Sequence, residues 1–482
     1  MKLQFLIPAA FNAAAWASSG VDEATKFTLT YGYPLMPFAH FAIPVLEEVK
    51  ATNRFLHMKE LATSSFKSVV RPNVDTLYSS AVLDMSLHDV VIDVPIVKGR
   101  YWVFPFYDAY GNNYVNLGSV TNSKAGKYIL RYDADEESGF HLCGEQFSRL
   151  KCDKGVQGII NAPTPYGIIV VRYAVTDAPG DLQQIHTLQK RTIMHTVVKS
   201  IAHSITTAPP LTMAMLNSSL SSDPATKIMQ LTARIAPHNP PSESSDLGRV
   251  ALMLKRAGIR QDGTYEQPRS VNLTAAYIAS ETAMFNAPTK PGNNQVLSNG
   301  WSEISAAAQG DYGKNYEMRA YVAYFGYLAL TAAQALYPSH STGEHGPSTL
   351  HLGPKQAYIF TFPSKPLLEQ YGFWSLTAYN AAQYLVPNAL DRYALTDRSN
   401  ITYADGSLVY GGQTSARKDG TFELLVQPAD VAPPRNWTSN WLPAPKGGGD
   451  LSLTLRFYAP TKQLHNGSWL YPVVHKIGAI VG

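Results

Sequence analysis

The segment RPNVDTLYSS, residues 71–80, is flanked by apolar residues at positions 69–70 and 81–83. Such flanks indicate chain that runs into a protein core. In an extended strand, residues two positions apart point to the same side, so Arg71, Asn73 and Asp75 would share one face. A buried charge is strongly unfavourable unless it is paired. We therefore expect either a structural network in which these residues and Tyr78 satisfy one another, or a pocket that they line.

The residues that follow this segment predict a β-rich module. They contain short runs rich in Val, Ile, Tyr and Phe, separated by Gly, Pro and Asn, a pattern typical of strands. The runs are SAVLDM, DVVIDVPI, RYWVFPFYDAY, KYILRY and GIIVVRYAV. Residues 181–206 are then predicted to form a helix, because apolar residues from Leu182 to Ile201 approximate one helical face.

Residues 245–338 predict a helical middle region with segments at 249–257, 273–285 and 316–336. The last segment is apolar almost all round, so it should be a buried helix. Arg319 near its start is expected to be a buried arginine bonded to carboxylate or carbonyl groups. From residue 351 the strand pattern resumes in QAYIFTF, GFWSLTAY, SLVYGG, FELLV and LSLTLRFYAP.

Together these patterns predict an α+β protein that is mainly β, with two β-sandwich or barrel-like modules around a helical middle. The 482 residues exceed the roughly 250–300 at which single cores usually stop growing. The expected divisions are a signal peptide at 1–17, an N-terminal β-rich module with flanking helices at 18–206, a helical region at 207–338 and a C-terminal β-rich module at 339–482.

The N-terminus predicts export. Lys2 precedes a mostly apolar stretch that ends in Ala15-Trp16-Ala17, a small-x-small cleavage site typical of signal peptides. The alternative is that this stretch is the first helix of the fold. No other run reaches the ~18 uninterrupted apolar residues of a membrane span. Because 40 basic residues stand against 36 acidic ones without a basic stripe, nucleic acid is not an expected partner. We expect a secreted protein.

Two further features agree with secretion. Cys143 and Cys152 are close in sequence, and in an oxidising compartment we expect them to form a disulfide, the alternative being two unpaired thiols. Five Asn-x-Ser/Thr sequons predict a glycosylated surface. The sequon asparagines are Asn217, Asn272, Asn400, Asn436 and Asn466.

Standard catalytic signatures are absent from the sequence. It contains no G-x-S-x-G elbow, H-E-x-x-H motif, P-loop or G-x-G-x-x-G after a strand, so no cofactor and no metal is expected. His340, Glu344, His345 and His351 lie in a turn-rich stretch, which favours a solvated loop over a metal or acid/base site.

A polar cluster in the first module is more informative. His57 lies upstream of the opening segment, and Arg100, Tyr107, Asp108 and Asn113 follow it. Such side chains can supply a proton acceptor, a phenol donor and an anion clamp. The alternative is a buried network that fixes the corners of the sheet.

Many motifs resemble a known pair of families. YGYPL, NRFLH, VVRPNVDTLYSSAVLDMS, GRYWVFPFYDAYGNN, APTPYGIIVVRY and Gly180-Asp181 resemble the domain of unknown function 1254. NGW, YEMRA, GFWSLTAYNA, DRYALTDR, DGSL, NWLPAP and LRFYAP resemble its usual companion, the domain of unknown function 1214. The resemblance runs from about Tyr31 to Pro460, departs from the usual acidic pattern near Glu344, and implies β-sandwich modules with helical insertions. Fungal relatives occur among secondary-metabolite genes, but the resemblance implies no particular reaction.

The motif residues predict a site between the two β modules. The candidate catalytic residues are Asp75, Asp108, Tyr107 and His57. The candidate substrate-binding residues are Arg71, Asn73, Tyr78, Arg319, Trp374, Tyr379 and Arg392. The predicted function is a secreted, cofactor-independent enzyme on a small, oxygenated, partly hydrophobic molecule, through isomerisation, cyclisation, elimination or hydrolysis. The alternative is a non-catalytic extracellular or cell-wall binding protein. Either kind of protein could form a homo-oligomer.

Overall fold

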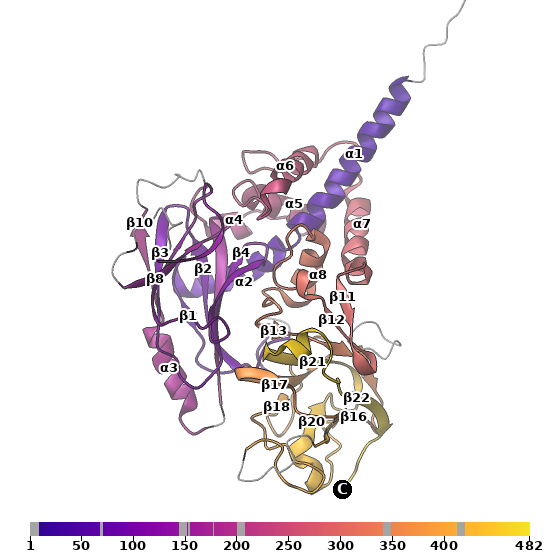
Figure 1. The fold of residues 1–482 in the computed structure, drawn as a ribbon. Coiled ribbons are helices and arrows are strands. Elements are labelled where there is room, and N and C mark those ends of the chain that lie inside the picture. The colour runs from indigo at the N-terminus through magenta and orange to yellow at the C-terminus, as the bar shows by residue number, and fades with distance from the viewer. Residues whose placement is uncertain are drawn as a thin grey trace, which may run out of the picture.

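The computed structural model describes residues 9–67, 71–143, 152, 155–176, 178–199, 208–340, 349–411 and 420–482. Its first β region, at the left of Figure 1, consists of two five-stranded sheets. The first sheet has the order β1 (Leu56–His57), β2 (Thr76–Asp84), β9 (Tyr166–Ala174), β4 (Trp102–Asp108) and β5 (Asn113–Gly118). The second has the order β10 (Ile193–Val198), β3 (His88–Val94), β6 (Gly126–Arg131), β8 (Val156–Asn161) and β7 (Gly139–Leu142).

These two sheets form a sandwich. Leu77, Phe104 and Ile169 of the first sheet share one buried core with Ile92 and Leu130 of the second. Because successive side chains of a strand alternate between its faces, the other face of the first sheet is free to pack elsewhere. Tyr107 and Ile168 belong to a separate core that includes helices, so the first sheet is buried on both sides.

The second β region, from orange to yellow in Figure 1, is also a sandwich. One sheet contains β13 (Ala335–Leu336), β21 (Gly449–Pro460), β17 (Leu368–Asn380) and β18 (Ala394–Thr396), and β15 (Thr349–Leu352) also pairs with β21. The other has the order β20 (Trp441–Ala444), β19 (Phe422–Pro428), β16 (Gln356–Phe362) and β22 (Val473–Gly478). Phe457 and Leu376 of the former meet Phe360 and Leu424 of the latter in a common core.

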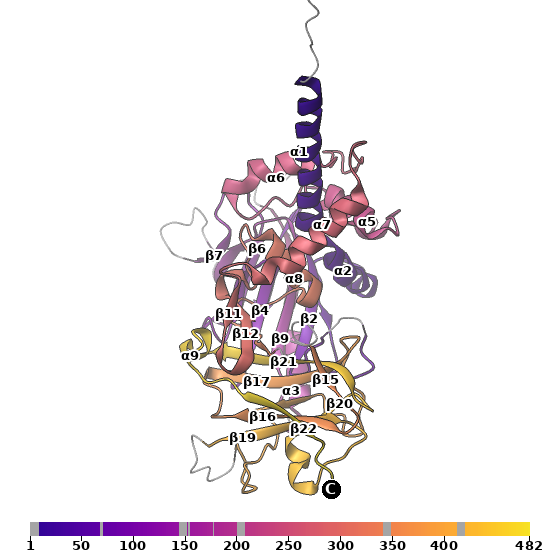
Figure 2. The same cartoon turned by 90° about the vertical axis from the view of Figure 1, so that its right-hand side faces the viewer.

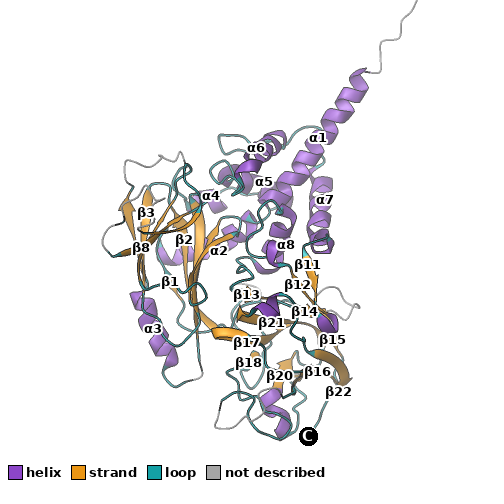
Figure 3. Ribbon diagram, viewed as in Figure 1, coloured by secondary structure: helices purple, strands orange, loops and turns teal. Residues whose placement is uncertain are grey.

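The helices gather beside the two sandwiches, as the colouring of Figure 3 shows. They are α1 (Ala9–Gly32), α2 (Leu35–Val49), α4 (Met213–Asn217), α5 (Pro224–Ile235), α6 (Leu247–Arg256), α7 (Leu273–Asn286) and α8 (Tyr316–Gly326). Two further helices are α3 (Asp181–Arg191) and α9 (Lys462–His465). In the described residues, no helix has the length and apolar character that crossing a membrane requires.

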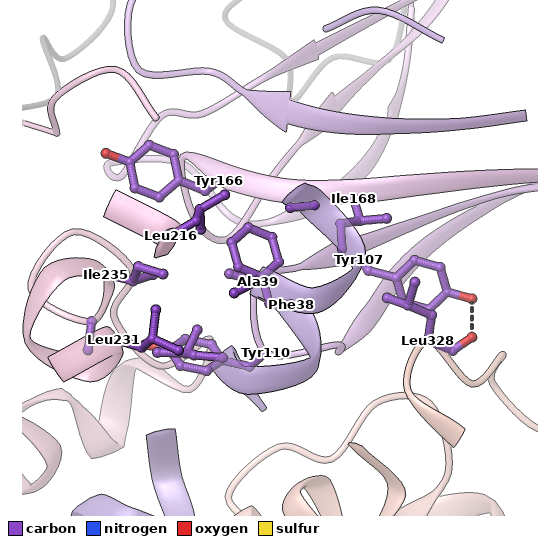
Figure 4. Packing of buried hydrophobic residues seen from close by; sticks show 14 of the residues in the cluster. Phe38, Ala39, Tyr107, Tyr110, Tyr166, Ile168, Leu216, Leu231, Ile235 and Leu328 are labelled. Atoms are coloured by element: carbon purple, nitrogen blue, oxygen red, sulfur yellow. Dashed lines mark hydrogen bonds between the residues drawn. The ribbon is translucent and has the colours of Figure 1, made fainter. Parts of the chain in front are cut away.

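Helix α2 connects the helices to the first sheet. Figure 4 shows Phe38 and Ala39 of α2 beside Tyr166 and Ile168 of β9 and beside Leu216, Leu231 and Ile235 of α4 and α5. The same core extends to Phe373 and Tyr458 of the second β region. One hydrophobic core therefore joins the helices to both sandwiches.

The predicted α+β architecture is confirmed as two antiparallel-rich sandwiches around a helical middle, without a closed barrel in the described residues. The predicted helices at 249–257 and 273–285 correspond to α6 and α7. The helix predicted for 181–206 is wrong beyond Arg191, because the residues from Ile193 pair with β3 as strand β10. Its sequence IMHTVV is rich in β-branched residues, which favour strands.

The helix predicted for 316–336 is also too long. Helix α8 ends at Gly326, and Leu328 has a φ of 66°, which no helix tolerates. The chain then reaches β13 in extended form. A small sheet contains β11 (Asn294–Val296), β12 (Trp301–Ile304) and β14 (Ser339–His340). Its first two strands lie within the region 207–338 that was predicted to be helical.

Helix α1 covers the predicted cleavage site and continues beyond it. Its first part projects from the body of the protein in Figures 1 and 2, whereas Ala24, Leu29 and Tyr31 are buried. Removal of residues 1–17 would leave those buried positions in place. Cleavage after Ala17 stays a prediction.

Candidate functional site

The first half of the opening segment, residues 71–75, is a turn and not a strand, which corrects the expected shared face. Arg71 has a φ of 48°, a conformation that is rare for residues other than glycine. The side-chain oxygen of Asn73 accepts hydrogen bonds from the backbone N–H of Asp75 (2.6 Å) and of Thr76 (3.0 Å). Strand β2 begins only at Thr76. The asparagine thus forms a local Asx turn, which is a common role for this residue.

The turn is bonded to the second β region. Arg456 Nη2 donates to Arg71 O (3.3 Å), the Tyr379 hydroxyl donates to Pro72 O (2.9 Å), and the Asn73 amide donates to the Tyr458 hydroxyl. The Arg71 side chain also donates to the Gln383 side chain (2.7 Å). The segment therefore bridges two parts of the chain that are far apart in sequence.

Asp75 is the acidic end of this bridge. It is 3% exposed and forms an ion pair with Arg398, with 2.5 Å between Oδ1 and Nη2. Arg398 Nη1 also donates to Val175 O (2.7 Å). The ion-pair partner of Asp75 is thus Arg398 and not one of the predicted site residues Arg71 and Arg392. The second carboxylate oxygen, Oδ2, is buried and has no hydrogen-bond partner among the described residues.

Arg172 lies next to this bridge on the face of the first sheet that points away from the sandwich core. It is directly opposite Tyr78 in the pairing of β9 with β2, and it is 7% exposed. Its Nη2 donates to Leu328 O (3.1 Å) and lies 3.5 Å from the Tyr107 hydroxyl. Its buried Nε has no hydrogen-bond partner. No ion pair joins Arg172 to any residue of the described chain.

Arg456 approaches from the second β region. It lies on β21 between Leu455 and Phe457, which belong to the sandwich core, so Arg456 points to the opposite side. It is 5% exposed, and its Nη atoms donate to the Thr377 hydroxyl (3.0 Å) and the Tyr379 hydroxyl (2.8 Å). Within the described residues it also forms no ion pair.

Tyrosines surround both arginines, and we call the group the arginine–tyrosine cluster. It consists of Arg172, Arg456, Tyr78, Tyr101, Tyr107, Tyr337 and Tyr458. Burial raises the pKa of the phenols of Tyr78, Tyr101, Tyr107 and Tyr458, while Arg172 acts in the opposite direction on each. These phenols are therefore neutral hydrogen-bond donors at neutral pH.

Positive charge is in excess at this interface. The guanidinium groups of Arg71, Arg172, Arg398 and Arg456 stand with two carboxyl groups, those of Asp75 and Asp397. Burial raises the pKa of Asp397 to about 6, so its negative charge is lost below that pH. A buried charge without an ion-pair partner is energetically unfavourable. The unpaired guanidinium groups of Arg172 and Arg456 therefore require an explanation.

Asp108 lies in a different buried network, which includes Arg319 of α8. Its carboxylate accepts from the backbone N–H of Tyr110 (2.8 Å) and from the side chain of Asn112 (2.6 Å). Burial raises its pKa, and Arg319 opposes this effect. Arg319 is 1% exposed and donates to Tyr31 O (2.9 Å), which confirms the expected buried arginine with a carbonyl partner.

Three other candidates lie apart from the cluster. His57 contacts the Ser79 hydroxyl (2.7 Å) at the edge of the first sheet. Trp374 belongs to the second sandwich core, where its indole donates to the Tyr410 hydroxyl (2.9 Å). Arg392 donates to the backbone carbonyls of Thr438 and Trp441. The structure thus brings Arg71, Asn73, Asp75, Tyr78, Tyr107 and Tyr379 together and leaves Asp108, Arg319, His57, Trp374 and Arg392 outside.

Arg172, Arg398 and Arg456 were not among the predicted site residues. Their signal was present, because Arg172 and Arg456 each interrupt an apolar strand in GIIVVRYAV and LSLTLRFYAP. A charged residue inside such a run is rarely buried without a specific partner. Arg398 closes the DRYALTDR motif and gave no comparable signal.

The turn-rich histidine stretch is described only in part, since Glu344 and His345 lie outside the described residues. His351 is exposed and contacts Asp450, with 2.7 Å between Nδ1 and Oδ1. In the part of the chain that the structure describes, no group of three or more His, Cys, Asp or Glu side chains is arranged to hold a metal ion.

The structure describes the two cysteines and the five sequon asparagines. Cys143 and Cys152 form the predicted disulfide, with their Cα atoms 5.7 Å apart. All five sequon asparagines have exposed side chains.

Comparisons with known proteins add domain assignments and a fold. The family model DUF1254, a protein of unknown function, matches residues 52–196, and the model DUF1214, also a protein of unknown function, matches residues 334–462. A search of curated proteins finds no match. The solved structure of the VPA0106 protein from Vibrio parahaemolyticus is 17% identical with a TM-score of 0.61, over 95% of this chain and 100% of that one. An uncharacterized protein from Burkholderia cenocepacia is 11% identical with a TM-score of 0.41, over 97% and 98% of the two chains. The first likeness indicates a shared fold.

Proposed function

Because this chain contains a DUF1254 domain and a DUF1214 domain that both contribute to the arginine–tyrosine cluster, we propose that their interface is the active site of a cofactor-independent enzyme. Its substrate is a small, oxygenated, partly hydrophobic molecule. The protein is a secreted glycoprotein of secondary metabolism, and it acts without nucleic acid or membrane partners.

One observation carries this proposal: two buried guanidinium groups, Arg172 and Arg456, have phenols and carbonyls around them but form no ion pair with a carboxylate of the described residues. A structural arginine in a core is normally paired, since leaving its charge unpaired costs several kcal/mol. In active sites, cations and hydrogen-bond donors are instead aimed at the place where negative charge develops. The cluster has the composition of such a site.

The cluster also has the groups that acid/base chemistry requires. Neutral phenols donate protons, and adjacent guanidinium groups stabilise the resulting phenolate or a substrate oxyanion. Tyr78 stands opposite Arg172, whose guanidinium carbon lies 5.5 Å from the centre of the Tyr78 ring. Isomerisation, cyclisation, elimination and hydrolysis all need only such positioned groups.

Three observations support secretion. The sequon asparagines are exposed, the disulfide forms, and removal of residues 1–17 would leave the buried residues of α1 in place. Disulfides persist in oxidising compartments, which agrees with an extracellular site of action.

The experiment is metabolite profiling of a deletion strain of the source organism, followed by complementation. The wild-type gene and the variant Arg260→Met, which alters an exposed arginine outside the cluster, are expected to remove the compound that accumulates. Arg172→Met and Tyr78→Phe are expected to leave at least ten times more of it. Tyr78→Phe removes only a hydroxyl group and keeps the ring, so its effect on the metabolite can be separated from an effect on folding.

Two results would contradict the proposal. One is an unchanged metabolite profile after deletion. The other is full complementation by both cluster variants at normal protein levels, which would leave the cluster with a purely structural role. Binding of the accumulating compound by purified protein without any turnover would instead indicate a non-catalytic binding protein.

A further inference from the structure

We infer that the interface between the two domains holds a delocalised oxyanion, a carboxylate or an enolate, on a small aromatic or conjugated molecule. This inference rests on the proposed function and specifies its substrate class. It combines the charge of the interface, the unused donors of Arg172 and the aromatic rings beside them.

The charge of the interface selects an anion. The guanidinium groups of Arg71, Arg172, Arg398 and Arg456 outnumber the carboxyl groups of Asp75 and Asp397, and Asp75 is already paired with Arg398. The neutral phenols do not cancel the remaining positive charge. In a buried environment of low dielectric constant, an anion would be attracted far more strongly than in water.

The geometry of Arg172 favours a ligand group in which two oxygen atoms share one negative charge, such as a carboxylate. Its Nη2 is occupied by Leu328 O, but Nε has no partner, and no hydrogen bond from Nη1 is formed within the described chain. A guanidinium group matches the two oxygens of a carboxylate because its N–H donors are planar and fixed in direction. Helix α8 ends at Gly326, and Leu328 follows with a positive φ. In this position the Leu328 carbonyl accepts a hydrogen bond from Nη2 of Arg172 and leaves Nε and Nη1 without a bond to it.

The rings beside the arginines favour an unsaturated molecule. Phe373 and Tyr458 are stacked with centroids 4.2 Å apart, and Tyr101 lies 5.3 Å from Tyr458 and 5.6 Å from Phe373. Arg398 lies over the Phe373 ring at 4.5 Å. Aromatic faces and edges bind planar conjugated groups through stacked and edge contacts. These rings and the arginines make one part of the interface apolar and another part cationic, which matches the composition of an aromatic anion.

The experiment is isothermal titration calorimetry of the full chain with sodium benzoate and with benzamide, which have nearly the same shape but differ in charge. We expect benzoate to bind and benzamide to bind at least tenfold more weakly. Arg172→Met and Arg456→Met should each weaken benzoate binding at least tenfold, whereas Arg260→Met on the exposed surface should not. Tyr78→Phe should weaken it less, because only one hydroxyl is lost, and it tests the site even if the arginine variants fail to fold.

The outcomes separate this inference from the proposed function. Equal binding of benzamide and benzoate, no binding of benzoate, or binding that is unaffected in Arg172→Met, Arg456→Met and Tyr78→Phe would each overturn the oxyanion inference. The proposed function would survive those results if a neutral metabolite that accumulates in the deletion strain bound and was turned over. It would fall only if the metabolite experiment failed as well.

Discussion

At the scale of one residue, Asp75 shows that the segment 71–80 connects the two domains. Its carboxylate is buried and pairs with Arg398 of the other domain, so Asp75→Asn would leave that guanidinium without its partner. Breaking a buried pair in this way costs roughly 3–5 kcal/mol. We expect a correspondingly lower free energy of unfolding in urea titrations followed by circular dichroism.

The matched control is Asp450→Asn, which breaks the exposed pair with His351. Exposed pairs contribute at most about 1 kcal/mol, so this variant should unfold almost like the wild type. If Asp75→Asn were as stable as Asp450→Asn while enzymatic turnover was lost, Asp75 would be a catalytic residue and not the structural tie described above.

Glu303 provides a prediction for the dependence of stability on pH. It is 4% exposed, its Oε2 has no hydrogen-bond partner, and burial raises its pKa to about 8 from an ordinary value of 4.5. Between these two values the folded chain keeps a proton that the unfolded chain has lost. Its contribution to stability is therefore present at low pH and falls as pH rises through this window.

Glu303→Gln removes this titration while keeping the side-chain shape. Relative to the wild type, the variant should gain little stability at pH 4 and roughly 4–5 kcal/mol at pH 8.5, measured by urea unfolding at both values. Glu423→Gln, at an exposed position of β19, serves as the control and should show no such change. A stability difference that does not increase with pH would contradict the assignment.

At the scale of elements, the spacing of β9 and β4 depends on a missing side chain. A Cβ atom at Gly167 would lie 2.3 Å from the backbone oxygen of Tyr107, which is too close without a shift of the strand. Gly167→Ala should therefore lower stability by roughly 1–3 kcal/mol, the usual cost of overpacking. Tyr107 is part of the cluster, so ligand binding should weaken as well.

Gly478→Ala in β22 is the matched control, because a Cβ atom there would meet nothing within 4 Å. Thermal unfolding of both variants separates steric overlap from a general effect of replacing a strand glycine. Equal melting temperatures for the two variants would show that β9 and β4 can move apart freely.

The elements also show how far the sequence could predict the fold. Short runs rich in Val, Ile, Tyr and Phe, separated by Gly, Pro and Asn, predicted the strands because strand formation depends on a local pattern. The end of α8 was not predictable in this way, since apolar composition does not distinguish a buried helix from buried irregular chain. The tie between Asp75 and Arg398 joins residues 323 positions apart, and only the packing of the domains brings them together.

At the scale of the whole molecule, the N-terminus and the surface carry a prediction about processing. The secreted protein should begin near Ser18, which lies within α1, and should lose mass after enzymatic removal of N-glycans. Mass spectrometry before and after deglycosylation measures both. A secreted product that retains Met1 and keeps its mass would contradict this prediction.

The central claim concerns the whole molecule as well: two domains meet around a cationic interface that holds a ligand. The most direct measurement is a crystal structure of the full chain crystallised with sodium benzoate. We predict density that does not belong to the protein, with oxygen atoms about 3 Å from Nε or Nη1 of Arg172. The claim would be contradicted by a structure in which protein groups or water alone occupy those donors and the arginine–tyrosine cluster is closed.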